Sequence, residues 1–228
     1  PRSTLFPYTT LFRSDLAIAI DLDPGYKTYW RQPGDSGVPP FFTWSRSQNL
    51  VIDGVDHPYP IRFSDGYGTS LGHEGQVTLP VRATVPDATA PVGVAVTIEL
   101  GICREMCVPV RVDLATVLKP GDVDTAAARD IAAARAVLPV AIDAAATIAP
   151  HPTDSRRVVL SVPGAREAVV DGPADWALPI PTLAADASEG RFELELDGIP
   201  KTATVSGTPV TVTYMTDAGP RESRTILP

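Results

Sequence analysis

Two stretches of alternating apolar and polar residues, one before Cys103 and one after Cys107, constrain the fold of this chain most strongly. Every second residue over 92–100 is apolar, and the same alternation returns over 108–114, after Cys103 and Cys107. A period of two is typical of strands in an antiparallel sheet with one covered face. The sequence therefore predicts a β-hairpin whose loop is 104–106.

The register of this hairpin would place Cys103 directly opposite Cys107. Opposed residues in an antiparallel pair have Cα atoms roughly 4.5–5.5 Å apart, and a disulfide needs about 4.4–6.8 Å, so a bridge is geometrically allowed. Both cysteines are out of phase with the apolar positions, so we expect both to point away from the core, where a partner could reach them. The apolar residues would then face each other in four pairs: Ile102 and Val108, Leu100 and Val110, Ile98 and Val112, and Val96 and Leu114.

Spacing alone leaves three roles open for the cysteine pair. A structural disulfide that closes a loop of about five residues stabilises by about 2 kcal/mol in the chain-entropy model, against about 4.7 kcal/mol for a hundred residues. A reversible redox couple is equally compatible with the spacing. A Cu(I) site is the third possibility, because Met106 adds a soft sulfur ligand to Cys103 and Cys107.

Composition and the absence of certain motifs argue against several classes of function. The chain has 228 residues, a hydrophobic fraction of 44% and a formal net charge of −8, which suits one large domain or two small ones with a real core. Net negative charge argues against nucleic acid and anionic membranes as partners. The sequence shows no nucleophile elbow and no glycine-rich phosphate loop after a strand.

The rest of the chain predicts further β structure around one helix. Alternating strands are expected over 16–22, 77–81, 158–160, 192–196 and 210–214, and Asp122 or Asp124 can cap a helix that Pro139 ends. We predict a mainly β fold with two tandem immunoglobulin-like sandwich domains joined by a short helix. The predicted parts are the first domain over 15–120, the helix and linker over 121–149, and a second domain without cysteines over 150–228.

A degenerate internal repeat supports a division into two domains. A single bent sandwich with an inserted helix is the alternative. Residues 74–79 resemble 189–194, and 91–96 resemble 209–214. In the second copy, 217–221 replace the cysteine loop. We expect the second domain to be a spacer or partner-binding module, with Trp176 and Phe192 in its core.

The first fourteen residues look artificial. Residues 4–14 resemble the translation of a common short-read sequencing adapter, so we exclude 1–14 from the fold and expect them to be disordered. A natural N-terminus with a signal peptide is then expected to be missing.

Residues 15–118 resemble the N-terminal periplasmic domain of the bacterial thiol:disulfide interchange protein DsbD, and more closely its ScsB-type and free-standing relatives. Residues 171–176 look like part of the second domain of longer family members. Four segments carry the main resemblance: 24–31 (PGYKTYWR), 64–70 (SDGYGTS), 76–81 (QVTLPV) and 101–109 (GICREMCVP).

The resemblance implies an immunoglobulin-like periplasmic redox domain of the thiol:disulfide oxidoreductase type, with a redox-active disulfide and no other cofactor. Such a domain takes electrons from a membrane-embedded DsbD-like reductase module, in cis or in trans, and passes them to periplasmic thioredoxin-fold proteins. The family is connected with cytochrome c biogenesis and copper tolerance. Carried over to this chain, Cys107 would form the mixed disulfide with partners and Cys103 would resolve it.

The resemblance also suggests residues around the couple. Tyr29 matches a family tyrosine near the cysteines, and Asp65 and Tyr67 match an acidic residue and an aromatic of a loop that caps them. Gly66 stands where DsbD has a phenylalanine over the disulfide, and the DsbD cysteines are further apart in sequence. Tyr67 or Tyr26 would then replace the missing ring, and ordinary packing of these tyrosines is the alternative.

Overall fold

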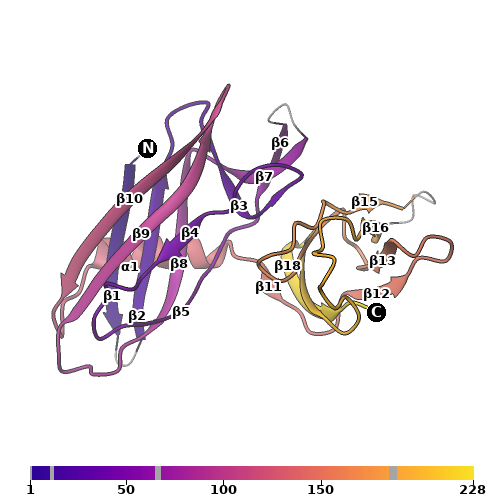
Figure 1. The fold of residues 1–228 in the computed structure, drawn as a ribbon. Coiled ribbons are helices and arrows are strands. Elements are labelled where there is room, and N and C mark those ends of the chain that lie inside the picture. Colours follow the sequence, from indigo (N-terminus) through magenta and orange to yellow (C-terminus); the bar gives the residue numbers. More distant parts are fainter. Residues whose placement is uncertain (1, 11–12, 65–67, 185–188) are drawn as a thin grey trace. The chain divides into compact units, whose positions relative to one another are not determined.

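The computed structural model describes residues 2–10, 13–64, 68–184 and 189–228, and side chains within these ranges from residue 15 onward. Strands dominate the described residues, as Figure 1 shows. The chain forms two compact units, each described by itself below. The first comprises Pro1–Pro33, Gly37–Asp65 and Leu71–Leu138, and the second Gly34–Ser36, Gly66–Ser70 and Pro139–Pro228.

The first unit is built on two sheets. One has the order β1-β2-β8-β5, and the other has the order β10-β9-β3-β7-β6, with β4 pairing with β9. The bounds of the first sheet are β1 (Arg2–Thr10), β2 (Arg13–Asp21), β8 (Gln76–Thr84) and β5 (Val51–Val55). The bounds of the second are β10 (Cys107–Leu118), β9 (Val92–Cys103), β3 (Lys27–Gly34), β7 (Thr69–Glu74), β6 (Ile61–Ser64) and β4 (Phe41–Thr43).

One apolar core lies between these two sheets. Leu16 and Ile18 of β2 join the same cluster of buried side chains as Val96 and Ile98 of β9. Each strand contributes alternate residues, as a sheet with one face toward a core requires. The predicted immunoglobulin-like sandwich is confirmed for this unit.

The second face of β2 differs from the prediction. The alternation over 16–22 predicts one buried face, with Ala17 and Ala19 on the opposite one, but both alanines are buried too. The reason is helix α1 (Thr125–Ala136), which contacts β1, β2 and β8. Small residues on β2 suit the close approach of this helix.

Helix α1 begins where the sequence predicts. The Oδ1 atom of Asp124 accepts hydrogen bonds from the backbone N–H groups of Ala126 (3.0 Å) and Ala127 (2.9 Å), which identifies Asp124 as the cap. Ala127 and Ile131 are buried on one face of the helix. The helix therefore belongs to the first unit, whereas the sequence placed it with a linker.

Strand β1 also differs from the expectation of disorder over residues 1–14. Its backbone pairs antiparallel with β2 along its whole length, from Arg2 opposite Asp21 to Thr10 opposite Arg13. Thr, Phe and Tyr recur in this segment, and these residue types favour strands. The edge of β2 supplies the backbone donors and acceptors that such a segment pairs with.

The second unit is a smaller pair of four-stranded sheets. Buried Leu160, Phe192 and Val212 belong to its core, and Trp176 packs against that core while staying half-buried. One sheet has the order β11 (Val140–Ala141), β18 (Gly219–Ile226), β17 (Pro209–Thr216) and β14 (Glu167–Asp171). The other has the order β12 (Thr147–Pro150), β13 (Arg157–Ser161), β16 (Arg191–Glu195) and β15 (Thr182–Leu183).

Corresponding turns in the two units support the internal repeat. Gly75 and Gly190 both have positive φ, 64° and 78°, in the two similar segments. The carbonyl of Gly75 accepts a hydrogen bond from Leu22 N (2.9 Å), and that of Gly190 accepts one from Val162 N (2.7 Å). The same turn therefore precedes an equivalent strand, β8 or β16, in each unit.

Two histidines are buried in the first unit. His57 is 5% exposed and His73 is 8% exposed, and neither Nδ1 of His57 nor Nε2 of His73 has a hydrogen-bond partner among the described residues. Burial lowers the pKa of His57 to about 3, and the charges of Arg31 and His73 contribute to the same shift. Burial lowers the pKa of His73 to about 4. Both side chains are thus neutral in the folded unit at neutral pH.

We predict that the first unit loses stability as the pH falls below about 6.5, the ordinary histidine pKa. The unfolded chain then takes up protons that the folded unit excludes until the pH approaches 4, so each histidine costs about 1.4 kcal/mol per pH unit over that window. Between pH 7.5 and pH 5 the free energy of unfolding should fall by about 2 kcal/mol for each histidine. Above pH 6.5 the pair makes no pH-dependent contribution.

Tryptophan fluorescence during urea unfolding can measure this change. Trp30 and Trp44 lie in the first unit and Trp176 in the second, so Trp176→Phe leaves a signal from the first unit alone. His57→Gln in that background should flatten the pH dependence, and His151→Gln, in the second unit, should leave it unchanged. Equal stability of the first unit at pH 7.5 and pH 5 would contradict the prediction.

Candidate functional site

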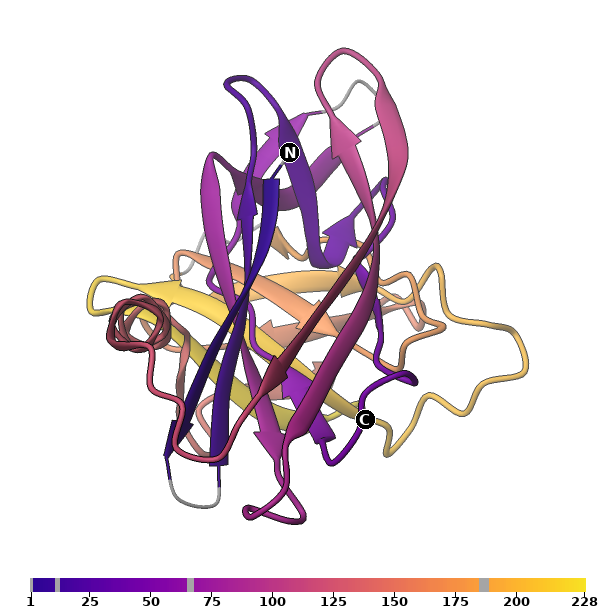
Figure 2. The same cartoon turned by 90° about the vertical axis from the view of Figure 1, so that its left-hand side faces the viewer.

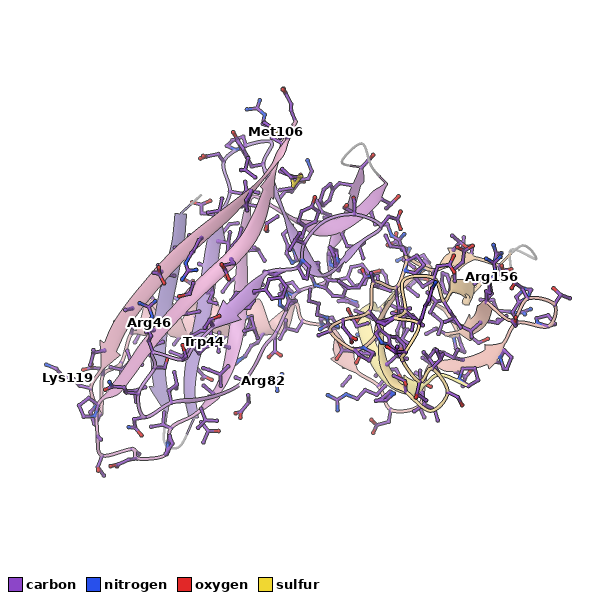
Figure 3. All side chains as sticks on the ribbon, in the orientation of Figure 1. Trp44, Arg46, Arg82, Met106, Lys119 and Arg156 are labelled. Atoms are coloured by element: carbon purple, nitrogen blue, oxygen red, sulfur yellow. A yellow bond between two sulfur atoms is a disulfide. The ribbon has the colours of Figure 1, made fainter. Side chains whose placement is uncertain are left out.

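The hairpin of β9 and β10 has the predicted register. Cys103 pairs with Cys107, and the apolar pairs run from Ile102 opposite Val108 to Val96 opposite Leu114. Figure 2 shows the two long strands twisting along their length, as right-handed strand twist requires. The loop carries Met106 at the tip of the hairpin (Figure 3), where the side chain is 75% exposed.

Cys103 and Cys107 form a disulfide, with Cα atoms 4.0 Å apart. The two sulfur-bearing residues differ in exposure. Cys103 is 3% exposed, whereas Cys107 is exposed. The expectation that both would be accessible is therefore wrong for Cys103.

The position of each strand in its sheet explains this difference. β9 is an interior strand, and Lys27 of β3 pairs with Cys103 on the side away from β10. β10 is the edge strand of the described sheet, so Cys107 has a neighbouring strand on one side only. Side-chain parity predicts the face of a residue, but it does not predict which strand lies at the edge.

Strand β3 places Tyr29 beside the disulfide. Thr28 pairs with Ile102, and its Oγ1 donates a hydrogen bond to the carbonyl of Gly101 (2.9 Å). The next residue, Tyr29, is 4% exposed, and its hydroxyl lies 3.1 Å from Cys107 Sγ. A disulfide sulfur carries no hydrogen, so the tyrosine O–H is the donor.

Tyr26 lies near the hairpin loop. Its ring packs against the core of the first unit, and the Arg104 guanidinium carbon is 5.6 Å from the ring centroid. This distance is within the range of a cation–π contact. Tyr26 therefore contacts the loop between the two cysteines. Asp65 and Tyr67, the proposed cap residues, lie outside the described residues, as does Gly66.

Two further side chains near the couple are not among the candidate residues that the sequence suggests, although Thr28 lies within the similar segment 24–31. Thr28 fixes β3 to β9 through the hydrogen bond described above, and the ring of Phe63 lies with its centroid 6.0 Å from that of Tyr29. Phe63 comes from β6, so only the tertiary fold brings it to Tyr29. No motif spacing links these residues to the cysteines.

No metal-binding cluster of three or more His, Cys, Asp or Glu side chains occurs among the described residues. The Cu(I) hypothesis uses Met106 in addition to the cysteines, and it stays a prediction. No helix in the described parts of the chain has the length and apolar character needed to span a bilayer.

Comparison with known proteins identifies the domain that carries this site. Residues 7–119 match the family described as "Thiol:disulfide interchange protein DsbD, N-terminal". This part of the chain belongs to that family. The match confirms the resemblance to DsbD and places the Cys103–Cys107 disulfide within a thiol–disulfide interchange domain.

The fold of the whole chain is similar to a solved structure, the N-terminal periplasmic domain of ScsB from Proteus mirabilis. The two share 18% sequence identity and superpose with a TM-score of 0.72, over 98% of this chain and 91% of that one. Another solved structure, the periplasmic chaperone SfaE, has 10% identity and a TM-score of 0.24 over all of both chains, which is too low to support an argument. No curated protein sequence matches the chain.

We predict that Tyr29→Phe makes reduced Cys107 less reactive near neutral pH. A hydrogen bond to a charged group contributes about 1.5–3 kcal/mol, so loss of the hydroxyl should decrease the thiolate population by about tenfold. The pH profile of alkylation of Cys107 by iodoacetamide, measured in a Cys103→Ser background, should move to higher pH. Tyr26→Phe is the matched control, because its ring lies against Arg104, whereas the hydroxyl that meets Cys107 Sγ belongs to Tyr29. An unchanged profile in Tyr29→Phe would show that the hydroxyl does not act on the thiolate.

Proposed function

We propose that the Cys103–Cys107 couple exchanges electrons with the cysteines of periplasmic thioredoxin-fold proteins, and that Cys107 is the attacking sulfur. The observation that carries this proposal is the unequal exposure of the two cysteines: Cys103 is 3% exposed and Cys107 is exposed. A partner sulfur must approach in line with the bond that breaks, so access selects the sulfur that is attacked.

The reaction proceeds through a mixed disulfide. In the reduced domain, the Cys107 thiolate attacks a disulfide of the partner, forms a Cys107–partner S–S bond and releases one partner thiolate, which takes up a proton. Cys103, as a thiolate after losing its proton to solvent, then attacks Cys107 Sγ and releases the second partner thiolate. Two electrons have moved to the partner, and the Cys103–Cys107 disulfide is restored.

Tyr29 supports the steps in which Cys107 carries negative charge. Its hydroxyl is 3.1 Å from Cys107 Sγ in the disulfide form, and it is held by a side chain that is 4% exposed. A donor already in place stabilises a thiolate without reorganisation. When the membrane reductase module attacks Cys107 and its second cysteine then resolves the mixed disulfide, the same contact assists Cys107 as the leaving group of that second step.

The surroundings of Cys107 suit a protein partner. Met106 is 75% exposed and Val108 is 44% exposed, on either side of Cys107 in sequence. Exposed apolar side chains next to a reactive group are a common feature of contact surfaces, and methionine adapts to different partners. We assign the domain to the periplasm because the family member of similar fold is a periplasmic domain.

Capture of a partner tests the assignment of Cys107. The probe is a thioredoxin-fold protein whose second active-site cysteine is replaced by serine and whose first carries a thionitrobenzoate group. Reduced Cys103→Ser should release thionitrobenzoate and form one stable mixed disulfide, since no resolving cysteine remains. Reduced Cys107→Ser is the matched control, and its buried Cys103 should react at least about tenfold more slowly.

The readouts are the rate of thionitrobenzoate release and the mass of the covalent complex. Equal rates for the two variants would contradict the role of Cys107. Failure of both variants, in a protein whose disulfide also resists reduction by mild thiols, would instead favour a static structural bridge. Stoichiometric Cu(I) binding by the reduced protein that is lost in Cys103→Ser would favour the metal hypothesis.

A further inference from the structure

Two glycines lie against the Tyr29 ring, Gly37 near Cε1 and Gly101 near Cε2. A Cβ atom on Gly37 would be 2.3 Å from Tyr29 Cε1, and a Cβ atom on Gly101 would be 3.0 Å from Cε2. Real Cβ atoms essentially never approach to the first distance, and the second is tighter than nine in ten real Cβ contacts. The ring therefore occupies a slot, here called the Tyr29 slot, whose two sides are Gly37 and Gly101.

The backbone holds both sides of the Tyr29 slot in place. Gly101 lies in β9 opposite Pro109 of β10, and its carbonyl accepts the hydrogen bond from Thr28 Oγ1. Gly37 has φ +106°, in a region that residues with a Cβ rarely adopt. Gly101 cannot move away from the ring without disturbing the pairing of β9 with β10, and a side chain at position 37 would be forced into a rarely adopted backbone conformation.

We propose that Gly37 and Gly101 are positioning residues for the redox couple. They leave the space that keeps the Tyr29 ring where its hydroxyl meets Cys107 Sγ at 3.1 Å. This inference rests on the proposed function, because it concerns the reactivity of the same sulfur. The new element is that the absence of a side chain at positions 37 and 101 controls the reactivity of Cys107 Sγ.

The slot favours the reduced couple. Reduction adds two electrons and one proton to the disulfide to give the Cys107 thiolate and the Cys103 thiol. A hydroxyl donates a stronger hydrogen bond to a thiolate than to a neutral disulfide sulfur. The positioned hydroxyl thus stabilises the reduced form and makes the couple more oxidising. A side chain that displaces the ring should make the couple more reducing.

Gly101→Ala tests this effect, because Gly101 lacks the positive φ of Gly37 and the added methyl group meets only the tyrosine ring. The equilibrium constant for reduction by glutathione should fall by about threefold to tenfold, where tenfold corresponds to about 30 mV. The pH profile of Cys107 alkylation should move to higher pH, as in Tyr29→Phe. Gly93→Ala is the matched control in the same strand, because its Cβ would lie at an ordinary 3.4 Å from Gln48.

The double variant Tyr29→Phe/Gly101→Ala separates positioning from a general structural effect. Phenylalanine keeps the ring that the alanine displaces but has no hydroxyl to misplace, so Gly101→Ala should change the potential little in this background. An equal change in both backgrounds, or no change in either, would overturn the proposal. If Gly101→Ala does not fold, Tyr29→Phe alone carries the same two readouts, and an unchanged potential after loss of the hydroxyl would overturn the proposal.

Partner capture by Cys103→Ser distinguishes the two possible failures. Absence of capture contradicts the proposed function itself. Normal capture together with an unaltered potential in Gly101→Ala, or in Tyr29→Phe where Gly101→Ala does not fold, contradicts only the role of the Tyr29 slot.

Discussion

The pairing of β9 with β10 is the constraint on which the redox site depends. Their register sets Cys103 against Cys107 and at the same time turns Val96 and Ile98 toward the core. Because the side-chain period of a strand is two, a slip of one residue would separate the cysteines and move every apolar residue to the other face. Burial of the core and formation of the disulfide therefore require the same alignment.

The two cysteines become chemically different through their neighbours. β3 covers one side of β9, so Cys103 lies in the interior of a sheet, while Cys107 lies on the edge strand. The same strand, β3, brings the hydroxyl of Tyr29 to Cys107. One element thus shields the proposed resolving sulfur and supplies a hydrogen bond to the proposed attacking sulfur.

The second unit repeats the architecture without the chemistry. Its β17–β18 hairpin has the same antiparallel pairing as β9–β10, and Thr216 pairs with Gly219 where the first unit has its cysteines. A short turn closes that hairpin without a disulfide, and Thr216 Oγ1 donates a hydrogen bond to the carbonyl of Gly219 (2.9 Å) across it. This comparison supports the view that the disulfide of the first unit serves exchange, because a hairpin of this kind closes without one.

The sequence by itself determined the two strands of the cysteine hairpin, their register and the family, and it narrowed the cap of α1 to Asp122 or Asp124, because period, turn residues and motif spacing are local properties of the chain. The tertiary structure decided what depends on distant segments. Helix α1 covers Ala17 and Ala19, and β3 buries Cys103. Likewise, Gly37 approaches Tyr29 only after the loop that follows β3 has folded back onto the ring. The exposure of a side chain and its close contacts depend on segments that are far apart in sequence. A periodic pattern along one strand contains no information about those segments.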